Sequence, residues 1–375
     1  MRYIEHTIDK MEGVQKELAL QMLDDPDLFS AKKDFAKWYR VQSSDADGFV
    51  KEIHDNLAIF RPNLNQIQTE KYIVDIIASN ALYGTSPAEF LKYHFEEKTD
   101  AARNTYITDA EKFIIFRPFY DFSQYEYVRD KWKQYSRLKE FFARDCMLLC
   151  EHSETEYEAF VRFVKAHPVF IFKPTRMSCG EGVQLIDTRN ADIAELYCSL
   201  TKSGGIADEK IEQNAIMSQF HSESANTIRI ICLRDSIQHK SYFTQALLRI
   251  GQGDDVIDNN EKAVRARIDV DSGIVYTVGL DGMGNTYIVH PDSNVKIVGF
   301  QVPQWETMLN MADKAMSVME SYAGFIGFDF ALSVTGWKIV EVNPFPQIYI
   351  QQMIGQTGSR PELLRLVKLC HKEIS

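Results

Sequence analysis

Two acidic residues and an asparagine near the C-terminal end have the types and spacing of a metal-binding hairpin. They belong to the segment Gly327-Phe-Asp-Phe-Ala-Leu-Ser-Val-Thr-Gly-Trp-Lys-Ile-Val-Glu-Val-Asn-Pro344. A three-residue loop with Gly336 in the left-handed conformation would place Asp329 opposite Glu341 on the neighbouring strand. Because side chains alternate along a strand, Asn343 joins the two acids on one face.

The same register predicts the position of the other side chains in the hairpin. It pairs Ser333 with Trp337 and Ala331 with Ile339. Its core-facing side consists of five apolar residues: Phe328, Phe330, Leu332, Val340 and Val342.

Two opposed carboxylates, with Cβ atoms about 5 Å apart, repel each other unless a cation lies between them. Two carboxylates and an amide oxygen suit Mg²⁺, which commonly takes substrate phosphates as its remaining ligands. The alternative is a solvated hairpin face whose acids pair with Lys or Arg. The predicted geometry leaves both interpretations open.

A second segment has the composition of a phosphate-binding loop, Phe172-Lys-Pro-Thr-Arg-Met-Ser-Cys-Gly-Glu-Gly-Val183. Gly180 and Gly182 allow backbone N–H groups to approach phosphate oxygens, and Lys173 adds a positive charge at the end of an apolar strand. The segment is not a P-loop, which would end in Gly-Lys-Ser or Gly-Lys-Thr. An ordinary hairpin turn is the alternative. Together with the acidic hairpin, the loop favours a site for a nucleoside triphosphate with magnesium.

The elements that must position these residues follow from hydrophobic spacing. Apolar residues recur at helical intervals up to about residue 105, and Ser86-Pro-Ala-Glu89 has the cap, proline and acid of a helix start. Further helices are expected at 131–142 and at 308–322. Another is expected after the acidic run at 151–158, and it should end near His167-Pro168. After Pro168 the pattern changes to that of strands. The strands are expected at 169–172, 183–186, 226–233, 241–250 and 264–270.

This order of elements predicts an α+β fold in four parts. The parts are a helical N-terminal region (1–105), a connecting segment (106–165), a smaller subdomain with the glycine loop (166–225) and a larger subdomain with the metal site (226–375).

Composition excludes several other classes of protein. The 375 residues carry a net charge of −11, which opposes nonspecific attraction to nucleic acid or anionic lipid. No apolar run approaches the roughly 20 residues of a membrane span, and the N-terminus lacks the apolar stretch of a signal peptide. Six cysteines without a Cys-x-x-Cys pair indicate reduced thiols. We therefore expect a cytoplasmic protein that binds small molecules.

Taken together, the motifs resemble those of the ATP-grasp superfamily, and specifically its sugar-transfer-associated branch. The resemblance runs from about residue 85 onward and depends on many short motifs in one order. They are Ser86-Pro-Ala-Glu-Phe90, Asp130-Lys131, Lys173-Pro174, Gly180-Glu-Gly182, Asn226-Thr-Ile-Arg229, Arg249-Ile-Gly251, Asp258-Asn259, His290-Pro291, Pro303-Gln-Trp305, Gly327-Phe-Asp329, Glu341-Val-Asn343 and Gln351-Gln352.

The resemblance implies a fold in which two α+β subdomains clasp ATP, and it implies roles for individual residues. Asp329, Glu341 and Asn343 would hold Mg²⁺. Lys131 and Lys173 would contact the ATP phosphates beneath a lid at 178–182. The remaining nucleotide contacts would come from Ser178, Gly180 and Gly182 in the lid, Gln219 and His221 in a hinge at 217–221 that reads adenine, and Glu223 or Asn226 beside the ribose.

The chain also departs from the superfamily pattern. The hinge has Ser218-Gln219 where an acid is usual, and Gly327 stands two residues before the metal Asp, where D-alanine ligases have Arg. Arg229 or Arg249 is expected to supply this missing positive charge and, with Lys173, to act in catalysis. Glu261-Lys-Ala-Val-Arg265 replaces the usual glycine pair.

The resemblance implies an ATP-dependent carboxylate–amine ligase that forms an acylphosphate. The branch name suggests that the ligase joins an amino acid to a sugar acid in cell-surface polysaccharide synthesis. Two alternatives remain open: an ATP-grasp kinase that phosphorylates a small-molecule or sugar hydroxyl, and a noncatalytic nucleotide-binding partner of a glycosyltransferase. His290 has the type of a catalytic residue, but a local hydrogen bond is the commoner role for a loop histidine.

Overall fold

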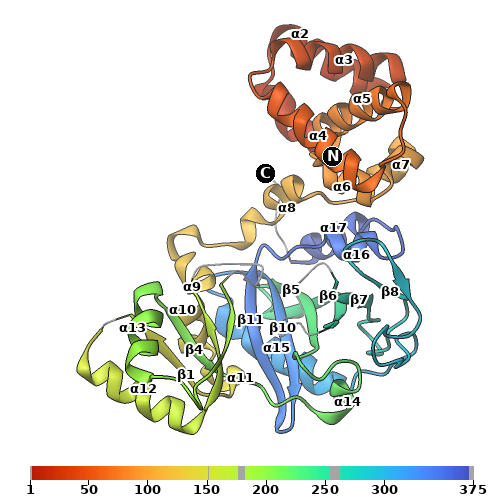
Figure 1. Ribbon diagram of the computed structural model, residues 1–375. Helices are drawn as coiled ribbons and strands as arrows, with labels where there is room; N and C mark the ends of the chain where they lie inside the picture. The colour runs from red at the N-terminus through yellow and green to blue at the C-terminus, as the bar shows by residue number, and fades with distance from the viewer. Residues whose placement is uncertain (1, 151, 176–181, 254–261, 371–375) are drawn as a thin grey trace. The chain divides into compact units, whose positions relative to one another are not determined.

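The computed structural model describes residues 2–150, 152–175, 182–253 and 262–370 (Figure 1). The chain divides into two compact units. The first combines Met1–Arg117 with Gln347–Lys368, and the second contains Pro118–Pro346.

The first unit is helical. Its elements are α1 (Tyr3–Thr7), α2 (Gly13–Asp24), α3 (Phe29–Gln42), α4 (Ala46–Phe60), α5 (Gln66–Tyr83), α6 (Pro87–Lys92), α7 (Asp100–Arg103), α8 (Asp109–Phe116), α16 (Tyr349–Met353) and α17 (Arg360–Leu369), with 3-10 turns at Ile8–Lys10 and Phe95–Glu97. The predicted start of α6 is confirmed, because Ser86 Oγ accepts from the backbone N–H of Glu89 and the Glu89 carboxylate accepts from that of Ser86.

The helical unit is larger than the predicted 1–105 region. It continues to Arg117 and includes 347–368, which the sequence placed with the larger subdomain. The buried Gln352 fastens this C-terminal segment, since its Oε1 accepts from the Ile107 N–H at 2.9 Å and its Nε2 donates to the Tyr93 hydroxyl at 3.0 Å. Side-chain hydrogen bonds over such sequence separations carry no periodic signal, so the boundary could not be predicted.

The second unit begins with a smaller four-stranded antiparallel sheet in the order β1-β4-β2-β3. Its strands are β1 (Cys146–Leu149), β2 (Val169–Lys173), β3 (Gln184–Asp187) and β4 (Gly205–Glu209). Helices α12 (Glu154–Ala166) and α13 (Ile193–Ser203) supply aromatic and aliphatic side chains to its core, where Phe160, Phe163 and Tyr197 pack with Phe170 and Phe172. This packing fixes the direction of β2, which ends at Lys173.

A larger seven-stranded sheet has the order β11-β10-β5-β6-β7-β8-β9. Its strands are β5 (Thr227–Asp235), β6 (Lys240–Ile250), β7 (Val264–Arg267), β8 (Gly279–Leu280), β9 (Thr286–Tyr287), β10 (Phe325–Ser333) and β11 (Gly336–Pro344). Helix α15 (Trp305–Met319) contacts β5, β6 and β10, with Met308, Met316 and Met319 completely buried. These three methionines are therefore core residues.

Short helices connect these layers. They are α9 (Glu126–Arg129), α10 (Lys131–Arg137), α11 (Lys139–Phe142) and α14 (Ala215–Ser218), with 3-10 turns at Arg117–Phe119 and Phe122–Gln124. The single helix expected at 131–142 is thus two helices, which meet at Leu138. In the described part of the chain, no helix has the length and apolarity needed to span a bilayer.

The β10–β11 hairpin confirms the predicted pairing of Asp329 with Glu341. The predicted pairing of the residues between Asp329 and the turn is wrong. Ser333 pairs with Gly336 and Ala331 with Lys338, so the register near the turn is one residue away from the prediction. A bulge between Phe330 and Asp329 then restores the expected pairing.

The bulged residue is Val340, because Phe330 pairs with Ile339 while Asp329 pairs with Glu341. In a bulge, two residues of one strand lie opposite a single residue of its partner. The alternation of inward and outward side chains along the bulged strand is therefore shifted by one residue. Accordingly Ile339 is completely buried, whereas Val340, predicted to face the core, is half-buried and lines a pocket.

Candidate active site

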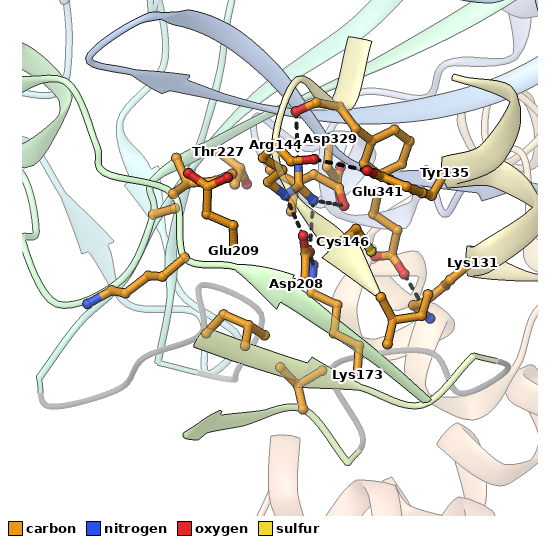
Figure 2. A pocket seen from close by; sticks show the side chains of 18 of the residues that line it. Lys131, Tyr135, Arg144, Cys146, Lys173, Asp208, Glu209, Thr227, Asp329 and Glu341 are labelled. Atoms are coloured by element: carbon orange, nitrogen blue, oxygen red, sulfur yellow. Dashed lines mark hydrogen bonds and ion pairs between the residues drawn. The ribbon is translucent and has the colours of Figure 1, made fainter. Parts of the chain in front are cut away.

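A pocket in the second unit collects charged residues from both sheets and from α10 (Figure 2). Six of the predicted site residues line it: Lys131, Lys173, Glu223, Arg249, Asp329 and Glu341. Basic residues thus lie close to the acids of the hairpin, as a site for a phosphate ester with a divalent cation requires.

Lys173 lies at the end of β2 and reaches a buried acid on the neighbouring strand β4. Its Nζ donates to Asp208 Oδ2 at 2.6 Å, and the Lys173 side chain is 17% exposed. Burial alone would raise the pKa of Asp208, but Arg144 and Lys173 outweigh burial and lower it to about 2. Asp208 is therefore ionised, and Lys173 is held on the wall of the pocket.

Lys131 is the first residue of α10 and faces the hairpin. Asp130 caps this helix by accepting from the N–H groups of Trp132 and Lys133, both at 3.0 Å. The Lys131 Nζ lies 3.1 Å from Glu341 Oε1 (Figure 2). The cap explains why Asp130 precedes this lysine, because it fixes the point where the helix starts.

Asp329 has two arginine partners. Arg229, directly opposite on β5, donates Nε to Oδ1 and Nη2 to Oδ2, each at 2.6 Å, and Arg249 Nη1 donates to Oδ2 at 3.0 Å. Burial opposes the charge of Asp329, but the two guanidinium groups outweigh it and hold the pKa of the carboxyl below its usual value.

Both acids of the hairpin therefore have cationic partners. This is the arrangement that the sequence left open as the alternative to a metal. Asn343 lies beside Asp329, because its Nδ2 donates to Asp329 Oδ2 at 3.4 Å and Gly327, two residues before Asp329, pairs with Asn343. The Glu341 side chain, 32% exposed, is the most accessible carboxylate of the set. Glu341 is therefore the carboxylate that could bind a magnesium ion, whereas Asp329 is held in place by its two arginines.

The three residues predicted for the hinge and for one side of the ribose lie outside the pocket lining. His221 is buried and bonds to the Gly253 carbonyl at 2.7 Å, and Asn226 donates to the carbonyls of Met217 and His221, both at 2.9 Å. Gln219 is exposed at the end of α14. His221 and Asn226 therefore stabilise the loop that leads into β5.

The pocket is instead lined by Glu209, Lys210 and Ile211, at and directly after the end of β4. This segment was not among the predicted site residues, because hydrophobic spacing did not indicate β4 as a strand. The Gly204-Gly205 pair followed by Ile206 and Ala207 was the available signal, since glycines that end a helix commonly precede a strand.

The proposed lid is only partly described. Ser178 and Gly180 lie outside the described residues. Gly182 has a φ of +72°, a conformation that favours glycine, while Val183 and Leu185 line the pocket.

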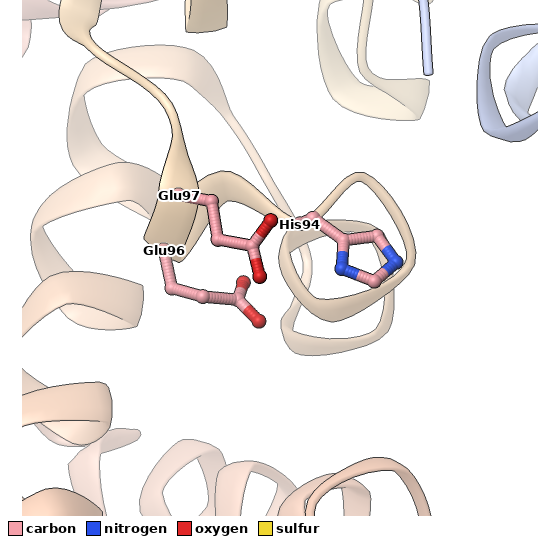
Figure 3. A group of neighbouring side chains, drawn as sticks. All are labelled: His94, Glu96 and Glu97. Carbon is pink, nitrogen blue, oxygen red and sulfur yellow. The ribbon is translucent and has the colours of Figure 1, made fainter. Parts of the chain in front are cut away.

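Another group of potential metal ligands, His94, Glu96 and Glu97, lies in the first unit (Figure 3). Arg61 already occupies it. Its Nε donates to Glu96 Oε1 at 3.0 Å, and its Nη2 contacts both that oxygen and His94 Nδ1. A guanidinium group at this position repels a metal ion, so we assign the cluster to the stability of the helical unit.

Two half-buried lysines beside an acidic hairpin, on two antiparallel sheets with α12, α13 and α15, are the arrangement expected of an ATP-grasp protein. The sequence pattern of the sugar-transfer associated ATP-grasp family matches residues 112–368, and the chain belongs to this family. The Ser86-Pro-Ala-Glu-Phe90 motif lies before the matched residues. No curated protein sequence matches the chain.

Similar solved structures include ATP-grasp ligases. The ligase PsnB with its minimal precursor is 10% identical and has a TM-score of 0.42 over 67% of this chain, which spans 64% of the length of PsnB. PsnB with Mg, ADP and a phosphomimetic variant of the precursor gives the same identity and TM-score, over 68% of this chain and 62% of that one. D-alanyl-alanine synthetase A from Vibrio cholerae O1 biovar eltor is also 10% identical with a TM-score of 0.42, over 65% of each chain.

Proposed function

We propose that this chain is an ATP-dependent carboxylate–amine ligase that works through an acylphosphate. The observation that carries the proposal is the meeting of Lys131, Lys173, Asp329 and Glu341 in one pocket of an ATP-grasp family member. In such a reaction a carboxylate attacks the γ-phosphorus of ATP, ADP leaves, and an amine then displaces phosphate from the acylphosphate.

ATP would lie with its phosphates between the two lysines and its base against the segment at the end of β4. The backbone of Glu209, Lys210 and Ile211 replaces the predicted 217–221 hinge as the partner of adenine in this proposal, and Glu223 is the ribose neighbour that lines the pocket. Ser178, Gly180 and Gly182 retain their proposed role as a lid over the phosphates. A closed lid would protect the acylphosphate from water.

Mg²⁺ would be held by Glu341, Asp329 and Asn343, and would neutralise charge on the transferring phosphoryl group. Arg229 and Arg249 orient Asp329 and contribute positive potential beside it. In this proposal, Arg229 and Arg249 supply the positive charge that D-alanine ligases obtain from an arginine at the position of Gly327. Lys131 balances Glu341 until the metal–nucleotide complex binds.

For the substrates, we propose a sugar acid as the carboxylate and an amino acid as the amine, used in cell-surface polysaccharide synthesis; the family description supports an association with sugar transfer.

The test has two stages. Calorimetric titration of Mg-ATP into the purified chain should give saturable binding, and a lack of binding would contradict the assignment. A screen of uronic acids against amino acids should then find a pair that releases phosphate only when both are present. Transfer of labelled γ-phosphate to a stable phosphorylated product would identify a kinase, and binding without turnover of any pair would favour a scaffold.

A further inference from the structure

Three charged side chains meet in the wall of the pocket: Arg144, Asp208 and Lys173 (Figure 2). Arg144 Nε and Nη2 donate to the two oxygens of Asp208 at 2.6 and 2.9 Å. The Arg144 side chain is 1% exposed and that of Asp208 6%. This two-point geometry is that of a strong, oriented ion pair.

Arg144 also reaches the strand that carries Glu341. Its Nη1 donates to the Ile339 carbonyl at 2.5 Å and its Nη2 to the Val340 carbonyl at 3.4 Å. Val340 is the bulged residue, where the regular pairing of β11 with β10 is interrupted. With a fifth contact to the Phe142 carbonyl at 3.4 Å, all five N–H groups of the guanidinium have an acceptor. Arg144 thus connects Asp208 to the backbone beside Glu341.

The three side chains together carry one excess positive charge. Arg144 and Asp208 balance each other, while Lys173 shares Asp208 Oδ2 and adds one positive charge. Lys173 is also the most exposed of the three, at 17%. Its excess charge can therefore attract an anionic group in the pocket.

From these contacts we propose that Asp208 is a positioning residue, which holds the Lys173 ammonium where a nucleotide phosphate binds. The proposal rests on the function proposed above and deepens it. Lysine has a long, flexible side chain, so an ammonium without a fixed partner loses conformational freedom when it binds phosphate. The hydrogen bond to Asp208 restricts the Lys173 side chain before the nucleotide binds, so less conformational entropy is lost on binding. Arg144 in turn holds Asp208 in place.

A double-mutant cycle on ADP affinity tests the proposal. The proteins are the parent, Asp208→Asn, Lys173→Met and the double variant, each titrated with Mg-ADP in a calorimeter. We expect Asp208→Asn to weaken ADP binding at least 5-fold in the parent background and less than 2-fold in the Lys173→Met background. An acid that acts only on stability would not show this dependence on Lys173.

The chain contains a matched control in its first unit. Asp75 also accepts from an arginine fork and a lysine, with Arg103 Nη1 at 2.8 Å, Arg103 Nη2 at 2.7 Å and Lys32 Nζ at 2.8 Å. Asp75→Asn removes the same chemistry away from the pocket lining. It should lower stability as Asp208→Asn does, while changing ADP affinity less than 2-fold.

Equal ADP affinity of the parent and Asp208→Asn would overturn the proposal, as would a loss that persists undiminished without Lys173. If Asp208→Asn does not fold, Asp208→Glu serves instead, because it keeps the charge opposite Arg144 but moves the carboxylate that holds Lys173. It should weaken ADP binding at least 3-fold, and unchanged binding would overturn the proposal. Failure of the parent itself to bind Mg-ADP would instead contradict the proposed function.

Discussion

Arg229 and Asp329 face each other on adjacent antiparallel strands and form a two-point ion pair with both N···O distances at 2.6 Å. The Asp329 side chain is 5% exposed and that of Arg229 14%. An acid this deeply buried needs a cationic partner, because the desolvation of a lone carboxylate is costly. The pair therefore fixes the orientation of a proposed metal ligand before any metal binds.

Arg229→Met should lower the free energy of unfolding by about 3–5 kcal/mol, since breaking a buried pair leaves its partner poorly compensated. Urea unfolding followed by circular dichroism measures the change. The matched control is Arg189→Met, whose pair with Asp187 is exposed to solvent and should contribute much less to stability than the buried pair. An Arg229→Met loss no larger than that of the control would contradict the structural role given to the pair.

Glu341→Gln should leave the fold unchanged and remove most phosphate release, by about 100-fold or more. The amide keeps the shape of the side chain and can still accept from Lys131, but it loses the charge that a magnesium ligand supplies. The measurement pairs steady-state phosphate release with thermal melting. Glu306→Gln, at an exposed position on α15, is the control and should turn over at the parent rate. Parent-like turnover in Glu341→Gln would exclude Glu341 as a metal ligand.

Stability should fall in acid because Asp208 and Asp329 have lowered pKa values in the folded chain. Their contribution is present above the pKa of an unfolded aspartate, near 4, and is lost as the pH falls through the folded values, which for Asp208 is about 2. Asp208 alone corresponds to about 2 kcal/mol. Urea unfolding at pH 7, 5, 4 and 3 should therefore show a decline that is shallower in Asp208→Asn. The exposed Asp271→Asn should follow the parent, and a parent-like slope in Asp208→Asn would argue against the buried pair.

His290 should make the chain less stable as the pH falls below about 6.5. The ring is completely buried, with Nε2 2.9 Å from the Gly251 carbonyl and Nδ1 3.2 Å from Ser293 Oγ. Burial lowers the pKa of His290, and His221 adds to this effect, while the Gly251 carbonyl and Asp292 oppose it. The unfolded chain therefore takes up the proton first, and stability is lost as the pH falls through the ordinary histidine value.

The measurement is the melting temperature between pH 7.5 and 5.5. His290→Gln cannot titrate, so its melting temperature should depend less on pH than that of the parent. The exposed His54→Gln should retain the parent slope. Identical slopes for the parent and His290→Gln would show that His290 does not titrate in this range.

Local sequence was enough to predict the parts of the site that lie within one element or one hairpin. The apolar run before Lys173 defined β2, and alternation around Asp329 and Glu341 placed both acids on one face. Ser86 and Glu89 predicted a helix start because a capping box is complete within four residues. The one error within the hairpin was the turn register, which a bulge at Val340 corrected, and bulges leave no clear mark in residue spacing.

Tertiary structure alone decided which charges meet. Arg229 and Asp329 are 100 residues apart, and only the pairing of β5 with β10 brings them together. The same holds for Arg144, which is 64 residues from Asp208 and 195 from the Ile339 carbonyl. Hydrophobic periodicity determines which face of a strand is buried, but it carries no information about which strand lies beside it. The amino-acid sequence by itself therefore determined most of the elements that carry the site and the pairing of the hairpin acids, but not β4, whereas the choice of partner for each buried charge depended on the order of strands in the two sheets.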